Sequence, residues 1–530
     1  MSASVALFRL LAAGLVANAC VAALVTPVEA QEKPLVVNSA TAPSTLDPAW
    51  ACGIDEISFI QNFYVRLTQN PAKPSVEGTT ETDFSKVAPY LAKSWTISDD
   101  LLVYTFKLND NYKFPSGKPV DSAAVKYSFE RLLKMNGCGA YFVTDGFESP
   151  SLIKSIETPD STTIIITLIH PDPNVLLDWS TPATSIVDAS VIEANGGVEA
   201  GKPNAYMSSH VAGSGPFLLD SYSANQGAKL SANPAFPGPG PLAKSIEVNW
   251  IGSAPTLLLQ ARTGNADITI GLAKQAAVTL KNNPATRVLA YSNPFAEQVI
   301  IPNGKEPWKN VKVREAAALA VPYQDIVDKV AYGYGKLYFG PIMPSLPGFN
   351  ADLSKPLAFD LDKAKQLMVE SGEKTPVDVE IMIHEGDAVQ QQVATILQST
   401  WKQIGINLIL KVTPAAQFQD MAEGHKAQAL MRLDGPGVFE IGYFLGYDLI
   451  CGSGFNLTEV CIPEADALLA KLRQTADPGE RQKLIDLITT LWRDQYPKLP
   501  LFEDEPVVVL SKAVKSFEFS PLPDYRAWSK

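Results

Sequence analysis

The sequence predicts an α/β protein that is divided into two or three structural units. With 530 residues, of which 46% are hydrophobic and 19% charged, the chain can bury a large core and is long enough for more than one unit. From residue 311 onward, long helical patterns alternate with short apolar runs of strand length. Helices that alternate with strands indicate an α/β lobe with a mostly open sheet, whereas residues 206–294 are rich in strand patterns and turns.

A compact module is predicted over residues 91–133, in the order strand, turn, strand, turn, helix. Tyr104, Phe106 and Leu108 occupy alternate positions, so they should share one buried strand face. Asp121 comes after a Pro-Ser-Gly turn and is placed to cap the helix. A second strand block, rich in Ile and Thr, follows and should complete the module.

Helix ends can be recognised in the C-terminal half of the chain. Asp360 is placed as the N-cap of a helix that stops at Gly372. A second helix is expected over residues 388–404, and Gly405 closes it. The strand at residues 406–412 then carries four apolar residues on one face. These ends support the alternation of helices and strands from which the α/β lobe is inferred.

The first thirty residues predict an export signal that is removed from the mature protein. Arg9 precedes an apolar run over residues 10–25, and the small-residue pattern Val-Glu-Ala follows at residues 28–30. The run is shorter than the about 20 predominantly apolar residues of a membrane anchor. We therefore expect a periplasmic protein. A lipoprotein form is disfavoured, because Cys20 lies inside the apolar run and lacks the usual preceding leucine.

The charge of the chain argues against nucleic acid as a partner. Its formal net charge is -12 at pH 7, and no compensating basic tract occurs anywhere along the sequence. A protein that follows a phosphate backbone needs such a tract of Lys and Arg. Solubility alone explains the acidic excess.

The cysteines that follow the signal predict two disulfides. In an oxidising compartment four cysteines are more naturally disulfides than metal ligands, and they allow three connectivities. The spacing of Cys451 and Cys461, across a loop that contains glycines, favours a local bridge and therefore pairs Cys52 with Cys138. A zinc site would need tighter Cys or Cys/His spacing, so we expect neither a metal nor another cofactor.

Short strings along nearly the whole mature chain resemble the signature of a known family. The strings are LDP at residues 46–48, LAKSW at 91–95, VYTFKL at 103–108, FPSGKPV at 114–120, GSGPF at 213–217, ADI at 266–268 and VKVREA at 311–316. They resemble the family 5 extracellular solute-binding proteins, which bind dipeptides, oligopeptides or nickel. The resemblance implies the receptor of an ABC importer, a monomer that captures a small organic ligand, peptide or non-peptide, and delivers it to a membrane permease.

The resemblance also implies a two-lobed periplasmic-binding-protein fold of the cluster C type. An inserted third subdomain and a ligand cleft between the lobes belong to this fold, and the cleft closes around the ligand by rigid-body motion. The expected parts are the signal peptide at residues 1–30, lobe I at 31–76, 206–294 and 498–530, the inserted subdomain at 77–205, and lobe II at 295–497.

Candidate ligand contacts follow from the peptide-binding relatives. In these relatives a strand ends in an aspartate that pairs with the ligand's amino group, and matching along the strand puts Asp434 there. Matching from the other side puts Met431 there, and a turn-capping role for Asp434 is the alternative. Dipeptide binders also hold the ligand carboxylate with an arginine near the start of the next helix. This chain has glutamines at residues 390–392, so dipeptides should bind poorly.

Further candidates surround the expected cleft. By resemblance, Trp50 and Cys52 lie near its mouth, where Trp50 either stacks on an apolar ligand or packs against the disulfide. His384 ends a strand, and it either bonds the ligand or is solvated. Tyr443 and Phe444 could line the wall of lobe II, since their aromatic density suits an apolar or ring-bearing ligand.

Three other functions are alternatives to a transport receptor. A secreted hydrolase would need paired carboxylates, and in the acidic run at residues 503–505 only Glu503 and Glu505 share a strand face. The sequence lacks a Gly-x-Ser-x-Gly elbow and a His-Glu-x-x-His motif. A metal or metal-chelate carrier is disfavoured by four widely separated histidines. A sensing or chaperone role would use the same cleft. We therefore expect a binding protein and not an enzyme.

Overall fold

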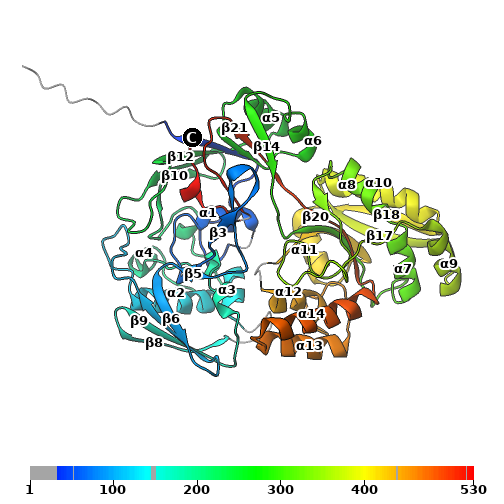
Figure 1. Cartoon of the computed structure of the whole chain (residues 1–530), viewed down its shortest axis with the longest axis horizontal. Coiled ribbons are helices and arrows are strands. Elements are labelled where there is room, and N and C mark those ends of the chain that lie inside the picture. Colours follow the sequence, from blue (N-terminus) through cyan, green and yellow to red (C-terminus); the bar gives the residue numbers. More distant parts are fainter. Residues whose placement is uncertain (1–32, 52, 145–150, 437–439, 521) are drawn as a thin grey trace, which may run out of the picture. The chain divides into compact units, whose positions relative to one another are not determined.

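Two large sheets organise the chain (Figure 1). The computed structural model describes residues 33–51, 53–144, 151–436, 440–520 and 522–530. Within these residues the first sheet has the order β10-β11-β12-β1-β13-β21-β14 and the second has the order β16-β20-β15-β19-β17-β18. The predicted export signal lies outside the described residues. In the part of the chain that is described, no helix has the length and apolar character to cross a membrane.

The strand bounds of the first sheet are β1 Leu35–Ser39, β10 Phe217–Ser223, β11 Gly227–Ala232, β12 Ser245–Trp250, β13 Ile268–Ile270, β14 Thr286–Ala290 and β21 Val507–Ser511. Those of the second are β15 Ala296–Ile300, β16 Gly335–Lys336, β17 Val377–His384, β18 Ile406–Thr413, β19 Ala429–Asp434 and β20 Lys498–Asp504. Both sheets mix parallel and antiparallel pairs.

The chain passes between the two sheets at two adjacent places. One crossing joins β14 to β15 and the other joins β20 to β21. The backbone N–H of Tyr291 donates to Pro506 at 3.2 Å, and that of Asp504 donates to Phe295 at 2.7 Å, so the crossings are bonded to each other. Two short connections side by side are the geometry of a hinge between lobes. The exact lobe boundaries expected from the sequence stay predictions.

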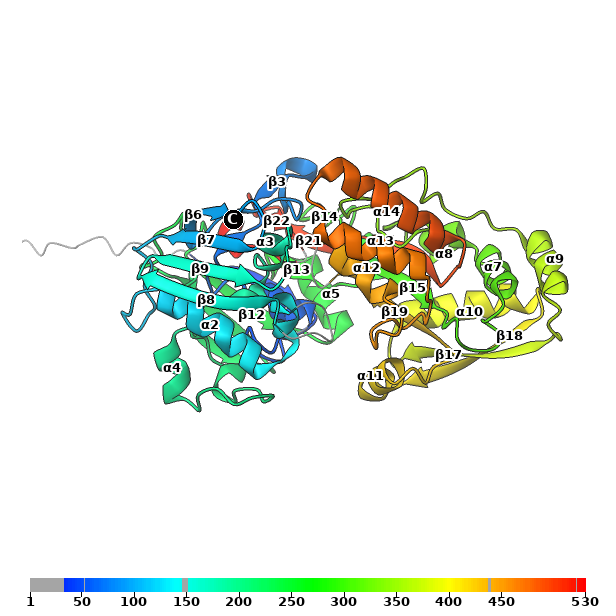
Figure 2. The same cartoon turned by 90° about the horizontal axis from the view of Figure 1, so that it is seen from below.

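Helices pack around the second sheet (Figure 1, Figure 2). Helix α10 packs against β17 and β18, whereas α13 lies between α12 and α14. Their common core includes the buried indoles of Trp308, Trp401 and Trp492. The bounds are α7 Val311–Leu319, α8 Tyr323–Lys329, α9 Leu361–Ser371, α10 Ala388–Lys402, α11 Ala415–Glu423, α12 Ile441–Leu449, α13 Pro463–Gln474 and α14 Pro478–Arg493.

The predicted ends of α9 are confirmed, whereas α10 begins at the predicted residue but ends at Lys402, two residues before the predicted end. Asp360 accepts a hydrogen bond from the backbone of Lys363 at 2.9 Å, and Gly372 ends α9 with a left-handed φ of 76°. The face predicted for residues 406–412 is buried only at its start. Val412 is 52% exposed, and β18 is the edge strand of its sheet.

The predicted compact module is a four-stranded sheet covered by a helix. Its strands have the order β6-β7-β9-β8. Tyr104, Phe106 and Leu108 are all 0% exposed, as the alternation predicts, and Asp121 caps α2 by accepting from Ala124 at 3.0 Å. The bounds are β6 Ala92–Ile97, β7 Val103–Leu108, β8 Ile153–Asp160, β9 Thr163–Leu168 and α2 Ser122–Met135.

Shorter elements complete the fold. A three-stranded sheet has the order β22-β4-β3, and β2 pairs with β5. The bounds are α1 Ile54–Ile60, α3 Val175–Asp178, α4 Ala189–Ala194, α5 Ala254–Thr263, α6 Lys274–Val278, β2 Thr68–Gln69, β3 Ala72–Pro74, β4 Thr80–Thr82, β5 Ala88–Pro89 and β22 Glu518–Phe519.

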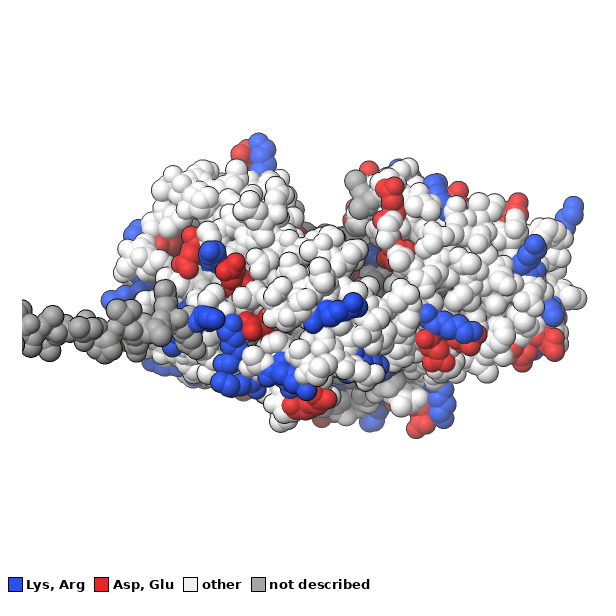
Figure 3. All heavy atoms as spheres, turned by 90° about the horizontal axis from the view of Figure 1, so that it is seen from above, with Lys and Arg blue, Asp and Glu red and all other residues white. Residues whose placement is uncertain are grey.

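Charged side chains of both signs are interspersed on the surface. On the face drawn in Figure 3, small groups of basic and acidic residues alternate on a largely uncharged background. Many are paired, for example Lys312 with Glu370 at 3.1 Å and Lys329 with Asp325 at 2.7 Å. The described part of this face carries no continuous basic tract of the kind that nucleic-acid binding requires.

Candidate ligand-binding cavity

Two cavities adjoin beside the two crossings. The charged cavity has a volume of about 380 Å³ and is lined from both sheets, from α6 and from α10. The aromatic cavity has a volume of about 350 Å³ and lies against the first sheet and α1. Each has the size of a small-molecule site. Both are lined by Ile270, Gly271, Tyr291, Leu433, Asp504 and Pro506. We therefore treat them as two halves of one site, the interlobe cavity.

The walls of the aromatic cavity are rings that pack against one another. Phe59 meets Trp250 edge-on, with ring centroids 5.5 Å apart. Trp528 stacks on Tyr525 at 4.1 Å and on Phe517 at 5.0 Å. All five rings line the cavity. Because each ring is held by its neighbours, they offer a preformed apolar surface to a ring or an alkyl chain.

Two polar side chains interrupt this apolar wall. Asp55 lies in the first turn of α1, where burial raises the pKa of its carboxyl and a hydrogen bond with Thr41 opposes this effect. Asn293 lies in the first crossing, and its buried Oδ1 atom has no hydrogen-bond partner among the described residues. Both groups present oxygen acceptors to whatever fills the cavity.

Three strands of the second sheet present one row of side chains to the charged cavity. Glu297 on β15 is paired in register with Leu433 on β19 and with Phe502 on β20, and all three line the cavity. Residues directly opposite each other in antiparallel strands share a face, and the next row points away. That next row contains Asp434 and Glu503.

The charged cavity contains three carboxyl groups and one lysine among its described lining residues. Asp504 binds the Nζ atom of Lys274 at 2.5 Å, and the same atom donates to the backbone oxygen of Tyr334. Asp387 is the N-cap residue of α10. Glu297 is 3% exposed, and its Oε1 atom has no hydrogen-bond partner within the described chain. The lysine is therefore occupied, and one buried carboxyl oxygen is not.

The surroundings of Glu297 favour its neutral form. Burial raises the pKa of Glu297 well above its usual value, and the charges of Asp387 and Asp504 raise it further. A hydrogen bond with Gln390 and the charge of Lys274 lower the pKa, but by less than burial raises it. The carboxyl group of Glu297 therefore keeps its proton over a wider pH range than an exposed glutamate does.

The predicted contact Asp434 lies on the face of β19 that points away from the cavity. Its Oδ1 atom accepts from the backbone N–H of Gly435 at 3.0 Å and lies 3.3 Å from the guanidinium of Arg432. Asp434 thus caps the turn, which is the alternative role that the sequence allowed. Met431, the other candidate, is buried in the hydrophobic core. A ligand contact at either residue stays a prediction.

His384 and Trp50 contact other parts of the protein. The ring of His384 stacks on Phe418 with centroids 3.7 Å apart, and burial lowers the pKa of His384. Trp50 packs on the core of the four-stranded module, where its ring occupies the space that a Cβ atom on Gly137 would need. Neither is among the described residues that line the interlobe cavity, so their ligand roles stay predictions.

Tyr443 and Phe444 are buried in α12. The ring of Tyr443 lies 5.7 Å from the guanidinium of Arg473 on α13, and that of Phe444 lies 5.9 Å from the Nζ atom of Lys498 on β20. The two rings therefore contact neighbouring elements, α13 in the case of Tyr443 and β20 in the case of Phe444. The interlobe cavity is lined by other described residues, and the ligand role of this pair stays a prediction.

The local disulfide is confirmed. Cys451 and Cys461 are bridged, with Cα atoms 4.7 Å apart, in the segment between α12 and α13. Cys52 lies outside the described residues. Its pairing with Cys138 and its ligand contact therefore stay predictions.

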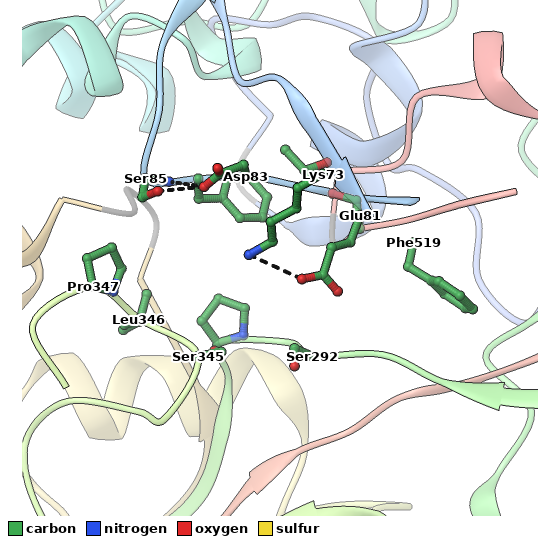
Figure 4. A pocket seen from close by; sticks show the side chains of 13 residues that line it. Lys73, Glu81, Asp83, Ser85, Ser292, Ser345, Leu346, Pro347 and Phe519 are labelled. Atoms are coloured by element: carbon green, nitrogen blue, oxygen red, sulfur yellow. Dashed lines mark hydrogen bonds and ion pairs between the residues drawn. The ribbon is translucent and has the colours of Figure 1, made fainter. Parts of the chain in front are cut away.

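A separate cavity of about 270 Å³ lies beside β4 and β22 (Figure 4). Lys73 and Glu81 point toward each other there, with Nζ and Oε1 3.2 Å apart. Asp83 accepts hydrogen bonds from the backbone and hydroxyl of Ser85. The charged groups of this cavity already have partners, in contrast to Glu297.

The geometry gives no support to a hydrolase or to a metal carrier. Glu503 is buried and accepts from the backbone of Ser345 at 3.1 Å, whereas Glu505 lies 3.4 Å from Lys336. The two carboxylates therefore serve structural contacts instead of flanking a substrate. Among the described residues, no three or more His, Cys, Asp or Glu side chains are grouped so that they could hold a metal ion.

Sequence reasoning missed the residues that line the charged cavity. Glu297 interrupts the apolar strand that begins at Ala296, and a charged residue inside such a strand is a signal that was available. Asp387 could be recognised only as a helix cap. In the sequence Asp504 is only the middle residue of an acidic run, whereas in the structure it is the member of that run that lines the cavity.

Comparison with known proteins identifies the family. Residues 86–456 match the family model described as bacterial extracellular solute-binding proteins, family 5 middle. A probable D,D-dipeptide-binding periplasmic protein of Escherichia coli is 28% identical over 492 residues, which cover 92% of each chain. Heme-binding protein A of Haemophilus influenzae is 27% identical over 506 residues, 91% of this chain and 89% of that protein.

The fold is shared with solved periplasmic binding proteins. The ABC transporter-associated periplasmic binding protein of Helicobacter pylori in complex with peptide STSA has a TM-score of 0.78 and 23% identity, over 94% of this chain and 97% of that chain. Its likeness agrees with the two-lobed α/β architecture described above. The chain belongs to the bacterial extracellular solute-binding proteins of family 5.

Proposed function

We propose that this protein is the extracytoplasmic receptor of an ABC importer and captures a small organic solute in the interlobe cavity. The observation that carries the proposal is that both sheets line the same cavity. Leu433 comes from the second sheet and Ile270 from the first, and the two crossings contribute Tyr291 and Pro506. A solute that contacts both sheets favours the closed arrangement of the lobes, which a permease can then recognise.

The class of solute is decided by this chain's own cavity. The similar proteins include a probable D,D-dipeptide binder and a heme-binding protein, so family membership alone leaves the solute open. The ring-lined half favours a solute with an apolar or aromatic part, whether peptide or not.

The remaining parts of the proposal concern how the receptor works. We place it in the periplasm after export, acting as a monomer that binds its solute without turnover and passes it to a membrane permease. The membership of a substrate-binding family and the unpaired groups of the interlobe cavity support binding as its task.

A ligand screen on the purified mature protein tests the proposal. Peptides, sugars, amines, guanidines, aromatic acids and metal chelates are compared by thermal shift. A solute at about 100 times its Kd should add about 2.7 kcal/mol to the free energy of unfolding. Leu433 lies at the junction of the two cavities and is 46% exposed. The variant Leu433→Trp should therefore fill the site and block it.

The control makes the same substitution at a leucine of comparable exposure outside the cavity. Leu259 on α5 is 58% exposed and lines neither half of the described cavity. We expect Leu433→Trp to abolish the ligand-induced shift and Leu259→Trp to preserve it. Equal shifts in both variants would place the binding site elsewhere, and turnover of a bound peptide would contradict the receptor function.

A further inference from the structure

The interlobe cavity presents acceptors that the protein leaves unpaired. Glu297 is almost fully buried, yet its Oε1 atom has no hydrogen-bond partner among the described residues. In the adjoining half, the buried Oδ1 atom of Asn293 is in the same situation. Buried polar atoms in folded proteins are nearly always paired, so an unpaired one on a residue that lines a cavity indicates a missing partner.

The lining of the charged cavity supplies no cation for Glu297 within the described residues. Lys274, its one basic side chain, is held by the carboxylate of Asp504 and the backbone oxygen of Tyr334. Asp387 adds a further carboxyl group from the start of α10. The cavity therefore holds one carboxyl group that its lysine does not compensate, Asp387, and one buried carboxyl group without a cation, Glu297, so the complementary positive group must come with the ligand.

We infer that the solute carries a positively charged nitrogen group, an ammonium or a guanidinium, which lies against Glu297 and Asp387, while its apolar part extends into the aromatic cavity. The inference rests on the proposed function and specifies its substrate class. Leu433 and Phe502 flank Glu297 in the same row, so they can cover the carbons next to the charged group. Tyr291 continues the apolar surface into the second half.

Other ligand chemistries fit this arrangement less well. A carboxylate or phosphate would be repelled by the charge of Asp387 and would oppose the ionisation of Glu297. A bare metal ion would need a set of converging ligands, and the described residues contain no group of three or more His, Cys, Asp or Glu side chains suited to one. An organic cation needs only the two carboxyl groups and the apolar row beside them.

Binding of such a cation should release a proton. The titratable groups that face Glu297 are Asp387 of α10, Asp504 of β20 and Lys274 of α6, and together with burial they hold the pKa of Glu297 well above its usual value. A cation placed against the carboxyl group favours the ionised form. In the pH range where Glu297 is protonated in the ligand-free protein, cation binding therefore favours release of that proton, and affinity rises with pH.

Calorimetry with matched probes tests the inference. Phenylbutylamine, phenylbutanol and phenylbutyrate share a skeleton and differ in charge. We expect the amine to bind at least about tenfold more tightly than the alcohol, as for a hydrogen bond to a charged group, and the acid to bind more weakly still. Titrations in two buffers of different ionisation enthalpy should show proton release with the amine alone.

Two variants and one control assign the effect to this cavity. Glu297→Gln should reduce the preference for amine over alcohol by about tenfold and remove the proton release. Asp387→Asn keeps a capping side chain at the start of α10 and should weaken amine binding in the same direction. Glu81→Gln makes the matched change in the separate cavity of Figure 4 and should leave the preference unchanged.

The outcomes separate this inference from the proposed function. Tight binding in the general screen that is confined to neutral or anionic solutes would overturn the cationic class and leave the receptor function standing. Amine binding that is equal in the wild type and in Glu297→Gln would overturn the placement of the charged group. Binding by no class of solute would contradict both proposals.

Discussion

Arg131 and Asp47 form a buried ion pair that ties α2 to the segment after β1. The NH1 and NH2 atoms of Arg131 lie 2.9 Å and 2.6 Å from the Oδ1 and Oδ2 atoms of Asp47. Oδ1 also accepts from the backbone N–H of Ala49 at 3.1 Å. Asp47 belongs to the LDP string that resembles the family signature. The string thus has a structural task, which is to fix the four-stranded module to the first sheet's N-terminal segment.

Loss of one partner of this pair should be costly. Asp47→Asn leaves the guanidinium of Arg131 buried without its counter-charge, so we expect the free energy of unfolding to fall by about 3–5 kcal/mol. Urea unfolding of the purified protein measures it. Replacing both partners, in Asp47→Leu with Arg131→Met, should recover part of the loss. The exposed pair of Lys126 and Glu130 on the same helix provides the control, since Glu130→Gln should cost less than about 1 kcal/mol.

Arg314, in the VKVREA string, should also be sensitive to a conservative change. It is buried and donates to backbone oxygens of Gln495 at 2.6 Å and Lys309 at 3.2 Å. A lysine has one nitrogen and cannot reproduce this fork. We expect Arg314→Lys to lower the free energy of unfolding by about 2–3 kcal/mol without changing ligand-induced shifts. If Arg314→Lys were no more destabilising than Arg262→Lys on the surface of α5, the hydrogen bonds of the Arg314 guanidinium would contribute little to stability.

Local features of the fold could be predicted because their causes are local. The cap at Asp121, the stop at Gly372 and the buried face around Phe106 depend on residues within a turn or a strand. The glycines of the GSGPF string belong to a different class. A Cβ atom on Gly215 would lie 2.3 Å from the backbone carbon of Phe63, and that contact joins segments far apart in the sequence.

The candidate site could not be assembled from sequence patterns for the same reason. Glu297 and Leu433 become neighbours through the register of β15 and β19, and a one-residue change of register would put the opposite faces together. Matching along the strand with peptide-binding relatives put Asp434 at the site of the ligand's amino group. The pleat instead turns Leu433 toward the cavity and Asp434 away from it.

The disulfide should stabilise the second sheet's helical layer to a moderate extent. Cys451 and Cys461 are separated by ten residues, and closing a loop of that length removes about 3 kcal/mol of chain entropy from the unfolded state. The double variant Cys451→Ser with Cys461→Ser should lose about that much in urea unfolding under oxidising conditions. The wild type in a reducing agent should approach the double variant, and a variant as stable as the oxidised wild type would contradict this account.

Glu503 is one of the buried carboxyl groups that should make stability fall between about pH 5 and about pH 8. Burial raises the pKa of Glu503 from 4.5 to about 7 in the folded protein, so folding takes up a proton between these values. The free energy of unfolding therefore decreases as pH rises through this window, by roughly 3 kcal/mol for a shift of this size. Glu503→Gln cannot ionise, so its free energy of unfolding should match that of the wild type near pH 5 but exceed it at pH 8, as measured by urea unfolding at each pH.

Burial also raises the pKa of Glu518 to about 7, so some decline should persist in the single variant and diminish further when Glu518→Gln is added. The surface change Glu130→Gln should leave the pH dependence of the free energy of unfolding as in the wild type. If Glu503→Gln also kept the wild-type pH dependence, the pKa of Glu503 would not be raised in the folded protein.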